Sequence, residues 1–383
     1  MIERHIKTLI EDYLKGESRK IFFIWGPRRS GKTTILKDIA SKLSVPIFNF
    51  DLLSDRELFV PVRDTLEKIA LEHKVILIDE VQNYPESTIA LKILFDEFNV
   101  KIIATGSSEL RQKGSSFDTL AGRFTESYCL PLSIEEINEN FHIKEYAKYN
   151  FQEKTAHQLQ VFGSYPEVYA NNMLSESEKI DLLQNILDTY VLKDIINIYD
   201  LKNEKLAKDI LTKIALQIGS EVSVRELANS FGANAVTVSN YIEIFIKNYV
   251  LIPLPSFKTN IRKAVSENRK LYFYDLGIRN ILVKDFRDLE LRPDKGGVFE
   301  NFIVSEIEKK RKNTHAKQTM YFYREYGGHE VDLVLENYKK EYNCIEMKID
   351  EKRISKDIFP LAHSFTIINM QNYYKEITGL FLM

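Results

Sequence analysis

A glycine-rich segment directly after a short apolar run is the feature that most constrains the fold of this chain. The run is IFFIW, residues 21–25, and the segment that follows it, GPRRSGKT at residues 26–33, matches the pattern GxxxxGK[ST]. Such a run is typical of a buried parallel strand, and the pattern is typical of a loop that leads from a strand into a helix. We therefore expect an α/β domain whose loop binds the phosphates of a nucleotide.

Each residue type in this loop has a chemical reason. Glycines let the backbone curl so that its N–H groups face the phosphates, and a lysine can reach the β- and γ-phosphates of ATP. The hydroxyl of Thr33 can be a ligand of Mg²⁺. We expect Lys32 to face solvent when no nucleotide is bound. The loop residues predicted to bind ATP are Gly26, Arg29, Gly31, Lys32, Thr33 and Thr34.

Two further apolar runs end in polar residues that can complete the site. VILIDE at residues 75–80 places Asp79 where it can hold Mg²⁺ and Glu80 where it can polarise the attacking water. VKIIATGSS at residues 100–108 ends in small polar residues, and we expect Ser107 to lie near the γ-phosphate. Strands that alternate with amphipathic helices predict a parallel sheet covered on both faces, with the site at the carboxyl ends of the strands.

The composition limits what else the chain can do. Its 383 residues exceed one compact core and predict two or three domains. With 53 basic and 55 acidic residues the net charge is −2, so any contact with nucleic acid must be a local patch. Cys129 and Cys344 belong to no cluster of metal-ligand type. No apolar run approaches the roughly 20 residues of a spanning helix, so we expect a cytoplasmic protein.

The chain resembles a large family of bacterial and archaeal AAA-type ATPases, on the motifs GPRRSGKTT, ILIDEVQN, IIATGSS, LAGRF, GSYPEVY and LYFYDLG. In that family a domain of unknown function follows the ATPase core, and the resemblance covers most of the chain. It implies ATP hydrolysis and makes Arg123 in LAGRF the candidate arginine finger. This residue would act within one subunit or reach into a neighbour of a homo-oligomer. The alternative is a surface arginine that pairs with Glu126 or Asp118.

Residues 223–252 predict a helix-turn-helix. Ser223 and Glu226 are typical of a capping box, FGAN interrupts the pattern, and the second helix carries an apolar stripe. The runs VLIPLP and LYFYD that follow are predicted as the strands of a wing. We expect the basic tip between them to grip DNA phosphates through Lys258, Arg262, Lys263, Arg269 and Lys270. The alternative is a module that packs on the ATPase core or binds a protein partner.

The last part of the chain contains a second acidic pattern. A helix at 298–312, a hairpin at 321–336 and a strand at 342–349 are predicted in that order. Side chains two apart on a strand share a face, so Glu346 and Lys348 point the same way and Asp332 can join them from the neighbouring strand. Alternating charged and apolar residues are also typical of any half-exposed strand.

This order of elements resembles the core of PD-(D/E)xK nucleases. The resemblance implies a metal site built by Asp332, Glu346 and an acid of the helix, where Glu300 is favoured and Glu306 is the alternative. It also implies that Lys348 orients or deprotonates the attacking water. One departure from the family pattern is that Val331, and not a proline, precedes Asp332.

We therefore predict four parts: a P-loop AAA-type ATPase core over 1–140, a helical lid and connector over 141–215, a winged helix over 216–290, and an α/β nuclease-like domain over 291–383. The predicted function is an ATPase whose nucleotide state controls a DNA-associated, metal-dependent nuclease-like domain. Two alternatives stay open. One is a signalling or scaffold ATPase that binds a protein partner and cleaves nothing, and the other is a DNA-binding regulator with an inactive nuclease fold.

Overall fold

The computed structural model describes residues 2–107, 117–171, 173–195, 203–258, 269–325, 328–349 and 358–381. Its contacts divide the chain into two units. One runs from Glu3 to Leu130, and the other comprises Met1–Ile2 and Pro131–Met383. We call residues 3–130 the first unit and the remaining residues the second unit.

A parallel sheet of five strands forms the centre of the first unit. The strands are β1 (Ile21–Trp25), β2 (Ile47–Asn49), β3 (Val75–Asp79), β4 (Lys101–Gly106) and β5 (Phe124–Tyr128). They lie in the order β2-β3-β4-β1-β5, with every neighbouring pair parallel. Because β4 lies between β1 and β3, the polar ends of these three strands meet at one edge of the sheet.

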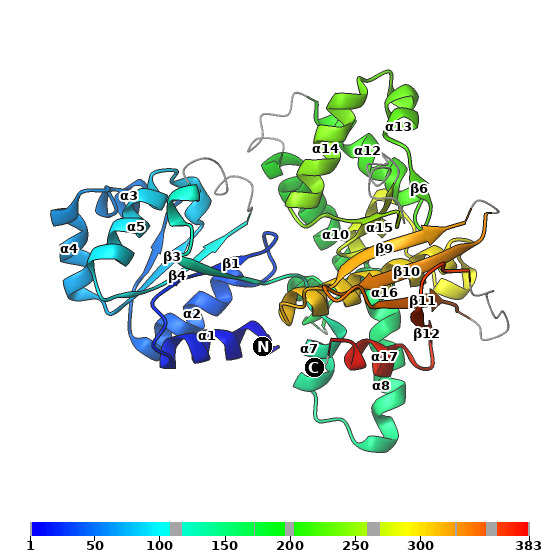
Figure 1. Cartoon of the computed structure of the whole chain (residues 1–383), viewed down its shortest axis with the longest axis horizontal. Helices are drawn as coiled ribbons and strands as arrows, with labels where there is room; N and C mark the ends of the chain where they lie inside the picture. The colour runs from blue at the N-terminus through cyan, green and yellow to red at the C-terminus, as the bar shows by residue number, and fades with distance from the viewer. Residues whose placement is uncertain are drawn as a thin grey trace. The chain divides into compact units, whose positions relative to one another are not determined.

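Helices cover both faces of this sheet, as the alternating pattern predicts (Figure 1). They are α1 (Ile6–Lys15), α2 (Lys32–Leu43), α3 (Leu53–Leu58), α4 (Arg63–Glu72) and α5 (Ser87–Glu97), with 3-10 turns η1 (Val81–Asn83) and η2 (Phe117–Leu120). The apolar faces of α1 and α2 pack on Phe22 and Ile24 of β1, while α4 and α5 lie on the opposite face. All five residues of β1 are buried, which explains its continuous apolar run.

The second unit contains many helices in addition to its two sheets. Its helices are α7 (Ile134–Asn140), α8 (Glu145–Phe162), α9 (Pro166–Tyr169), α10 (Glu176–Ile186), the π-helical η3 (Leu187–Asp194), α12 (Glu204–Leu216), α13 (Val224–Phe231), α14 (Ala235–Lys247), α15 (Leu276–Val283), the 3-10 turn η5 (Leu289–Leu291), α16 (Lys295–Asn313) and α17 (Tyr373–Gly379). One apolar core joins α8, α10, α12 and α15 with the helix-turn-helix.

Two helices and two strands lie where the helix-turn-helix and its wing were predicted. Ser223 caps α13 by accepting the N–H of Glu226, and the buried stripe of α14 includes Val238, Ile242 and Phe245. A small antiparallel sheet follows in the order β6-β8-β7, made of β6 (Glu221–Val222), β7 (Leu251–Pro255) and β8 (Arg269–Phe273). Strand β8 supplies residues to the acidic site described below.

A four-stranded sheet stands at the end of the chain. It has the order β12-β11-β10-β9, with β9 (Thr319–Arg324), β10 (Glu330–Glu336) and β11 (Tyr342–Met347) antiparallel and β12 (His363–Ile368) parallel to β11. Helix α16 precedes this sheet in the chain and packs against both β11 and β8. The predicted helix, hairpin and strand are therefore present in the predicted order. The division of residues 131–383 into lid, winged helix and nuclease-like domain stays a prediction.

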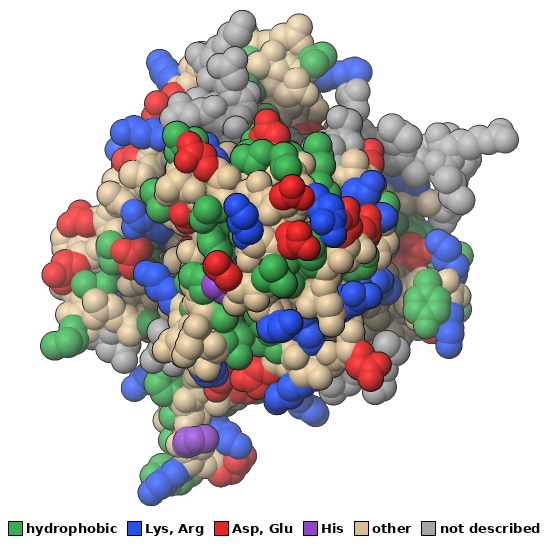
Figure 2. Space-filling model, turned by 90° about the vertical axis from the view of Figure 1, so that its left-hand side faces the viewer, with side chains coloured by type: hydrophobic (Ala, Val, Ile, Leu, Met, Phe, Trp, Pro, Cys, Tyr) green, Lys and Arg blue, Asp and Glu red, His purple; other side chains and the backbone are tan. Residues whose placement is uncertain are grey.

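Two general expectations concern the surface. Within the described ranges, no helix is long and apolar enough to cross a membrane. The face of the molecule shown in Figure 2 intersperses acidic and basic side chains, in keeping with a net charge of −2. Because the two signs are mixed, we do not expect this face to attract a charged partner over a large area.

Candidate functional site

The phosphate loop runs from the end of β1 to the start of α2, where the pattern places it. A Cβ atom on Gly26 would lie 2.0 Å from the carbonyl oxygen of Cys129, so this position requires glycine. Gly31 has a φ of 103°, in the region that side chains disfavour. Arg29 and Thr34 are both exposed. The two glycines are thus fixed by close approach at one position and by backbone conformation at the other.

Lys32 does not face solvent, and that expectation is wrong. Its ammonium donates to the carbonyl oxygens of Gly26 and Pro27, both at 2.8 Å, and its side chain is buried. An ammonium carries three donors, and without a phosphate the nearest acceptors are the carbonyls of its own loop. Burial lowers the pKa of Lys32, which the negative charge of Glu80 partly opposes. A bound phosphate would therefore compete with these carbonyls for the ammonium.

Asp79 connects the ends of three elements. Its carboxylate accepts a hydrogen bond from the Thr33 hydroxyl at 2.8 Å and another from the Thr105 hydroxyl. Thr33 lies at the start of α2, Asp79 ends β3, and Thr105 stands near the end of β4. Hydroxyl and carboxylate oxygens are suitable ligands for a hard cation such as Mg²⁺. The donor set at this edge of the sheet therefore fits the expected ion.

Glu80 belongs to a second polar group beside Asp79. It has a left-handed backbone with a φ of 54°, and its carboxylate accepts a hydrogen bond from the side-chain amide of Gln82. The same amide nitrogen lies 2.9 Å from the Ser107 hydroxyl, and the Gln82 amide oxygen accepts the Ser107 N–H at 3.3 Å. Gln82 thus joins the predicted base to the predicted γ-phosphate contact. The role of Gln82 was not predicted from its position in ILIDEVQN.

Arg123 lies at the opposite end of the sheet from the phosphate loop. Its carbonyl oxygen accepts the N–H of Ile21, the first residue of β1, and the loop begins only after Trp25, the last. At about 3.3 Å per residue the strand separates these ends by about 13 Å. The guanidinium pairs instead with Asp96 of α5, at 2.8 Å from Nε to Oδ1. In this structure Arg123 therefore does not contact the phosphate loop of its own subunit, and its acidic partner is Asp96 and not the expected Glu126 or Asp118.

Arg4 contacts the phosphate loop, although no motif in the sequence predicted this contact. Its Nη1 atom donates to the carbonyl oxygen of Ser30 at 2.7 Å, and Nη2 donates to that of Leu130 at 2.5 Å. The thiol of Cys129 donates to the same Ser30 oxygen at 3.3 Å. Arg4 is 7% exposed, so its charge is largely removed from water.

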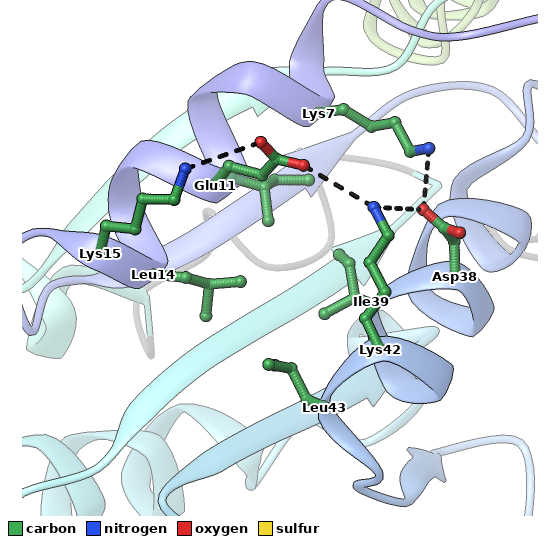
Figure 3. A pocket seen from close by; sticks show the side chains of 9 residues that line it. Lys7, Glu11, Leu14, Lys15, Asp38, Ile39, Lys42 and Leu43 are labelled. Carbon is green, nitrogen blue, oxygen red and sulfur yellow. Dashed lines mark ion pairs between the residues drawn. The ribbon is translucent and has the colours of Figure 1, made fainter.

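A groove of about 430 Å³ lies between α1 and α2, and Figure 3 shows its apolar floor and charged rim. It is lined by Lys7, Ile10, Glu11, Leu14, Lys15, Asp38, Ile39, Lys42 and Leu43. The lining residues of α2 begin more than one helical turn after Lys32. The groove is therefore not the phosphate site.

Three carboxylates gather in the second unit. One oxygen each from Glu300 of α16 and from Glu330 and Asp332 of β10 lie within 4.8 Å of one another. The ammonium of Lys270, on β8, lies 2.9 Å from the Glu300 carboxylate and also pairs with Glu330. Tyr272 donates a hydrogen bond to Glu300. We call these five residues the acidic cluster.

Lys270 is the most deeply buried cation that contacts this cluster, and Arg324 also pairs with Glu330. The Lys270 side chain is 1% exposed. Burial by itself would lower the pKa of Lys270, but the adjacent charges of Glu300 and Glu330 outweigh it and raise the pKa. The oxygen donors would fit a divalent ion, yet an ammonium already neutralises two of the three carboxylates. A metal ion held by all three would have to replace the contacts of Lys270.

The other predicted acids and the lysine of the nuclease-like site also converge. The Lys348 ammonium lies 2.7 Å from the Glu346 carboxylate and 3.6 Å from that of Asp332. Asp332 also accepts the N–H of Met347 at 2.8 Å. Burial by itself would lower the pKa of Lys348, but the charges of Asp332 and Glu346 outweigh it and raise the pKa. A protonated lysine at this position can offset negative charge on a bound phosphate.

Glu306 does not join this group. Its carboxylate pairs with Lys309 at 2.7 Å and accepts the N–H of Ile134 at 2.7 Å. It lies six positions after Glu300 on α16, which is about 9 Å along the helix axis. Glu300 is therefore the helical acid that the fold brings to Asp332, and Glu306 has a structural partner.

The basic wing differs from the expectation in one residue above all. Lys270 is buried in the acidic cluster, so the prediction that it contacts DNA is wrong. Arg269 pairs with Glu243 of α14 at 2.8 Å, while Lys258 is exposed. Arg262 and Lys263 lie outside the described residues.

Three regions of the chain match known domain families. Residues 18–138 match an AAA domain. Residues 153–290 match a domain of unknown function, DUF8612, and residues 295–373 match a second, DUF4143.

Two uncharacterized proteins are similar to this chain in sequence over most of its length. An uncharacterized protein of Methanocaldococcus jannaschii is 27% identical over 377 residues, covering 94% of this chain and 81% of that protein. An uncharacterized protein of Haemophilus influenzae is 24% identical over 72% of each chain. Among solved structures, a Walker-type ATPase of Pyrococcus abyssi is similar with a TM-score of 0.47 and 15% identity, over 74% of this chain and 96% of that one. Residues 18–138 thus match an AAA domain, and the two regions that follow in the same chain match domains of unknown function.

Proposed function

We propose that the first unit binds ATP with Mg²⁺ and hydrolyses it, so that nucleotide state controls the second unit. The observation that carries this proposal is the network in which Asp79 accepts hydrogen bonds from Thr33 and Thr105. It brings the end of the phosphate loop, the acidic end of β3 and the polar end of β4 to one place. These are the parts that phosphoryl transfer to water requires.

Each polar residue of this site has its own role in the proposed hydrolysis of ATP. The Lys32 ammonium leaves the carbonyls of Gly26 and Pro27 and binds the β- and γ-phosphates. Thr33 and Asp79 hold Mg²⁺, which would offset the charge of the phosphates when bound. Glu80 orients the attacking water and accepts its proton, and the amide of Gln82 fixes the direction of the Glu80 carboxylate.

The experiment is a comparison of ATP binding and steady-state hydrolysis in the wild type and in Glu80→Gln. The amide keeps the size of the side chain but cannot accept the proton, so we expect unchanged affinity and hydrolysis slowed by about a hundredfold. The control is Glu86→Gln at the start of α5, which should match the wild type. Normal turnover by Glu80→Gln would remove this residue from the role of base.

A second candidate function is metal-dependent cleavage of nucleic acid by the second unit. The observation that favours it is the convergence of Asp332, Glu346 and Lys348 beside Glu300. In this proposal Glu300, Asp332 and Glu346 hold a divalent cation. Lys348 stays protonated and offsets the charge that develops on the phosphate. DNA contact through Lys258, Arg262 and Lys263 of the wing belongs to the same proposal.

Its test is incubation of single-stranded, duplex and branched DNA and RNA with Mg²⁺ or Mn²⁺, with and without ATP. Cleavage that is lost in Lys348→Ala and kept in Lys340→Ala, a control lysine on the exposed end of the same sheet, would support the proposal. ATP hydrolysis without cleavage of any substrate would favour a switch that binds a protein partner.

A further inference from the structure

We propose that Arg4 is a positioning residue of the ATP site, which fixes the direction of the Ser30–Gly31 peptide in the phosphate loop. This inference rests on the proposed binding of ATP. It adds to that site a residue that precedes the first helix and belongs to none of the motifs. The ligand concerned is the phosphate chain of a nucleoside di- or triphosphate.

The geometry of the peptide group carries the first step. A trans peptide is planar, and its C=O and N–H bonds point in opposite directions. The Ser30 oxygen is held by Arg4 Nη1 at 2.7 Å and by the Cys129 thiol at 3.3 Å. The N–H of Gly31 must therefore point away from Arg4. In a loop of this pattern the backbone N–H groups bind the phosphates. Arg4 therefore orients one of these donors, the Gly31 N–H, by holding the opposite side of its peptide group.

The charge of Arg4 strengthens the same donor. A guanidinium stays protonated in proteins, and its hydrogen bonds are roughly twice as strong as those between neutral groups. Its Nη1 atom lies 3.7 Å from the point where a Cβ of Gly31 would stand. A cation bound to the Ser30 oxygen polarises the peptide and makes the Gly31 N–H a better donor to an anion. Burial of Arg4 keeps this field from being screened by water.

Helix α1 holds Arg4 in place. The Arg4 carbonyl accepts the Lys7 N–H at 2.9 Å, so Arg4 leads directly into the first turn. Two ion pairs in Figure 3 connect α1 to α2: Lys7 with Asp38 at 2.8 Å, and Glu11 with Lys42 at 3.7 Å. Helix α2 also carries Lys32 at its start. The helix that begins in the phosphate loop therefore anchors the helix that positions Arg4.

At the other end of α1, a lysine of β4 fixes the helix to the sheet. Lys101 donates to the carbonyl oxygens of Tyr13 and Leu14 at 2.7 and 2.8 Å. Both ends of α1 are thus attached to elements of the nucleotide core. Arg4 consequently reaches the loop from a rigid support, as a positioning residue requires.

The second contact of Arg4 is one that a lysine at this position could not make together with the first. Nη2 donates to the carbonyl oxygen of Leu130, the last residue of the first unit, while Nη1 holds Ser30. The planar guanidinium presents several donors in a fixed geometry, whereas a lysine ends in one ammonium. Arg4→Lys would keep the charge near the loop but lose the fork that spans both carbonyls.

The experiment measures the dissociation constants of MgATP and MgADP by calorimetry on the full chain. The variants are Arg4→Ala, Arg4→Lys and the control Arg63→Ala, whose arginine forms an exposed ion pair with Glu97 on α5. Steady-state kinetics supply KM and kcat. Melting curves recorded without nucleotide identify a temperature at which every variant is folded, and binding is measured at that temperature.

For Arg4→Ala we expect both dissociation constants to rise about tenfold, which equals about 1.4 kcal/mol. KM should rise alike while kcat changes less than about threefold, because the Gly31 N–H contacts the phosphates before and during the reaction. Arg4→Lys should lie between Arg4→Ala and the wild type, and Arg63→Ala should equal the wild type. A merely structural arginine would lower the melting temperature without changing affinity among folded molecules.

Three results would overturn the inference. The first is an Arg4→Ala variant that binds MgATP within twofold of the wild type. The second is a large loss of kcat at unchanged affinity, which would give Arg4 a different role. The third is a wild type that binds no MgATP, and this result alone would also refute the proposed function. If Arg4→Ala fails to fold, wild-type affinity in Arg4→Lys would refute the need for the fork.

Discussion

Lys270 offers the sharpest test of how the acidic cluster is held together. Its ammonium is buried and pairs with Glu300 and Glu330, whose ligand oxygens lie within 4.8 Å of each other and of Asp332. Lys270→Met keeps most of the side-chain volume and removes only the charge. Breaking a buried ion pair by removing one partner costs roughly 3–5 kcal/mol, because the remaining charges lose their counter-ion. We expect a loss of stability of this size.

The assay is urea unfolding of the full chain in EDTA, followed by circular dichroism of the second unit's helices. The control is Lys295→Met on α16, where the ion pair with Glu290 is exposed and the expected loss is below about 1 kcal/mol. Mn²⁺ or Ca²⁺ should then restore stability to Lys270→Met, since Glu300 and Glu330 have lost the ammonium and the ion can replace its charge. At a hundred times the dissociation constant the gain is about 2.7 kcal/mol.

Two results would refute this reasoning. A loss as small as that of Lys295→Met would show that the Lys270 ammonium is not the counter-ion of the cluster. A full loss that no divalent ion reverses would show that the carboxylates form an ion-pair network and not a cation site. That second result would also count against cleavage chemistry at Glu300 and Asp332.

Three further predictions concern other parts of the chain. If Arg123 completes a neighbouring site, Arg123→Ala and Glu80→Gln should each be slow, and mixing them should restore hydrolysis, which an unchanged rate in the mixture would contradict. Gly26→Ala should destabilise the first unit by about 1–3 kcal/mol, because its Cβ would meet the Cys129 carbonyl at 2.0 Å, and a melting temperature equal to the wild type would count against this contact. The Arg287 side chain lowers the pKa of Asp285 to about 2 from its usual 3.8, so the carboxylate stabilises the fold above that usual value and the benefit is lost as pH falls toward 2. Asp285→Asn should therefore lose less stability between pH 4 and 2 than the wild type does in acid unfolding.

The nucleotide core could be predicted because its signals are local. Gly26 and Lys32 stand six positions apart in one short motif, and Asp79 ends an apolar run that is typical of a buried strand. The state of the Lys32 side chain was not accessible in this way. Whether the ammonium meets water or a carbonyl depends on how the loop curls, and the pattern gives only the residues.

The contacts that the sequence could not reveal join distant parts of the chain. Arg4 precedes Ser30 by 26 positions and Leu130 by 126, and no periodicity relates them. Lys270 reads as one of several basic residues in a wing, yet the register of β8 turns it toward α16 and β10. Arg123 belongs to the motif LAGRF, whose family resemblance predicted an arginine finger. Only the sheet shows that Arg123 lies at the end of β1 away from the phosphate loop.

The central claim is that the loop over residues 26–33 binds ATP. The most direct measurement is a calorimetric titration of MgATP into the wild type, Lys32→Ala and Lys37→Ala, the last an exposed lysine of the same helix. We predict binding by the wild type and by Lys37→Ala, and none by Lys32→Ala with its melting curve preserved. Equal affinity in Lys32→Ala and the wild type would contradict the claim.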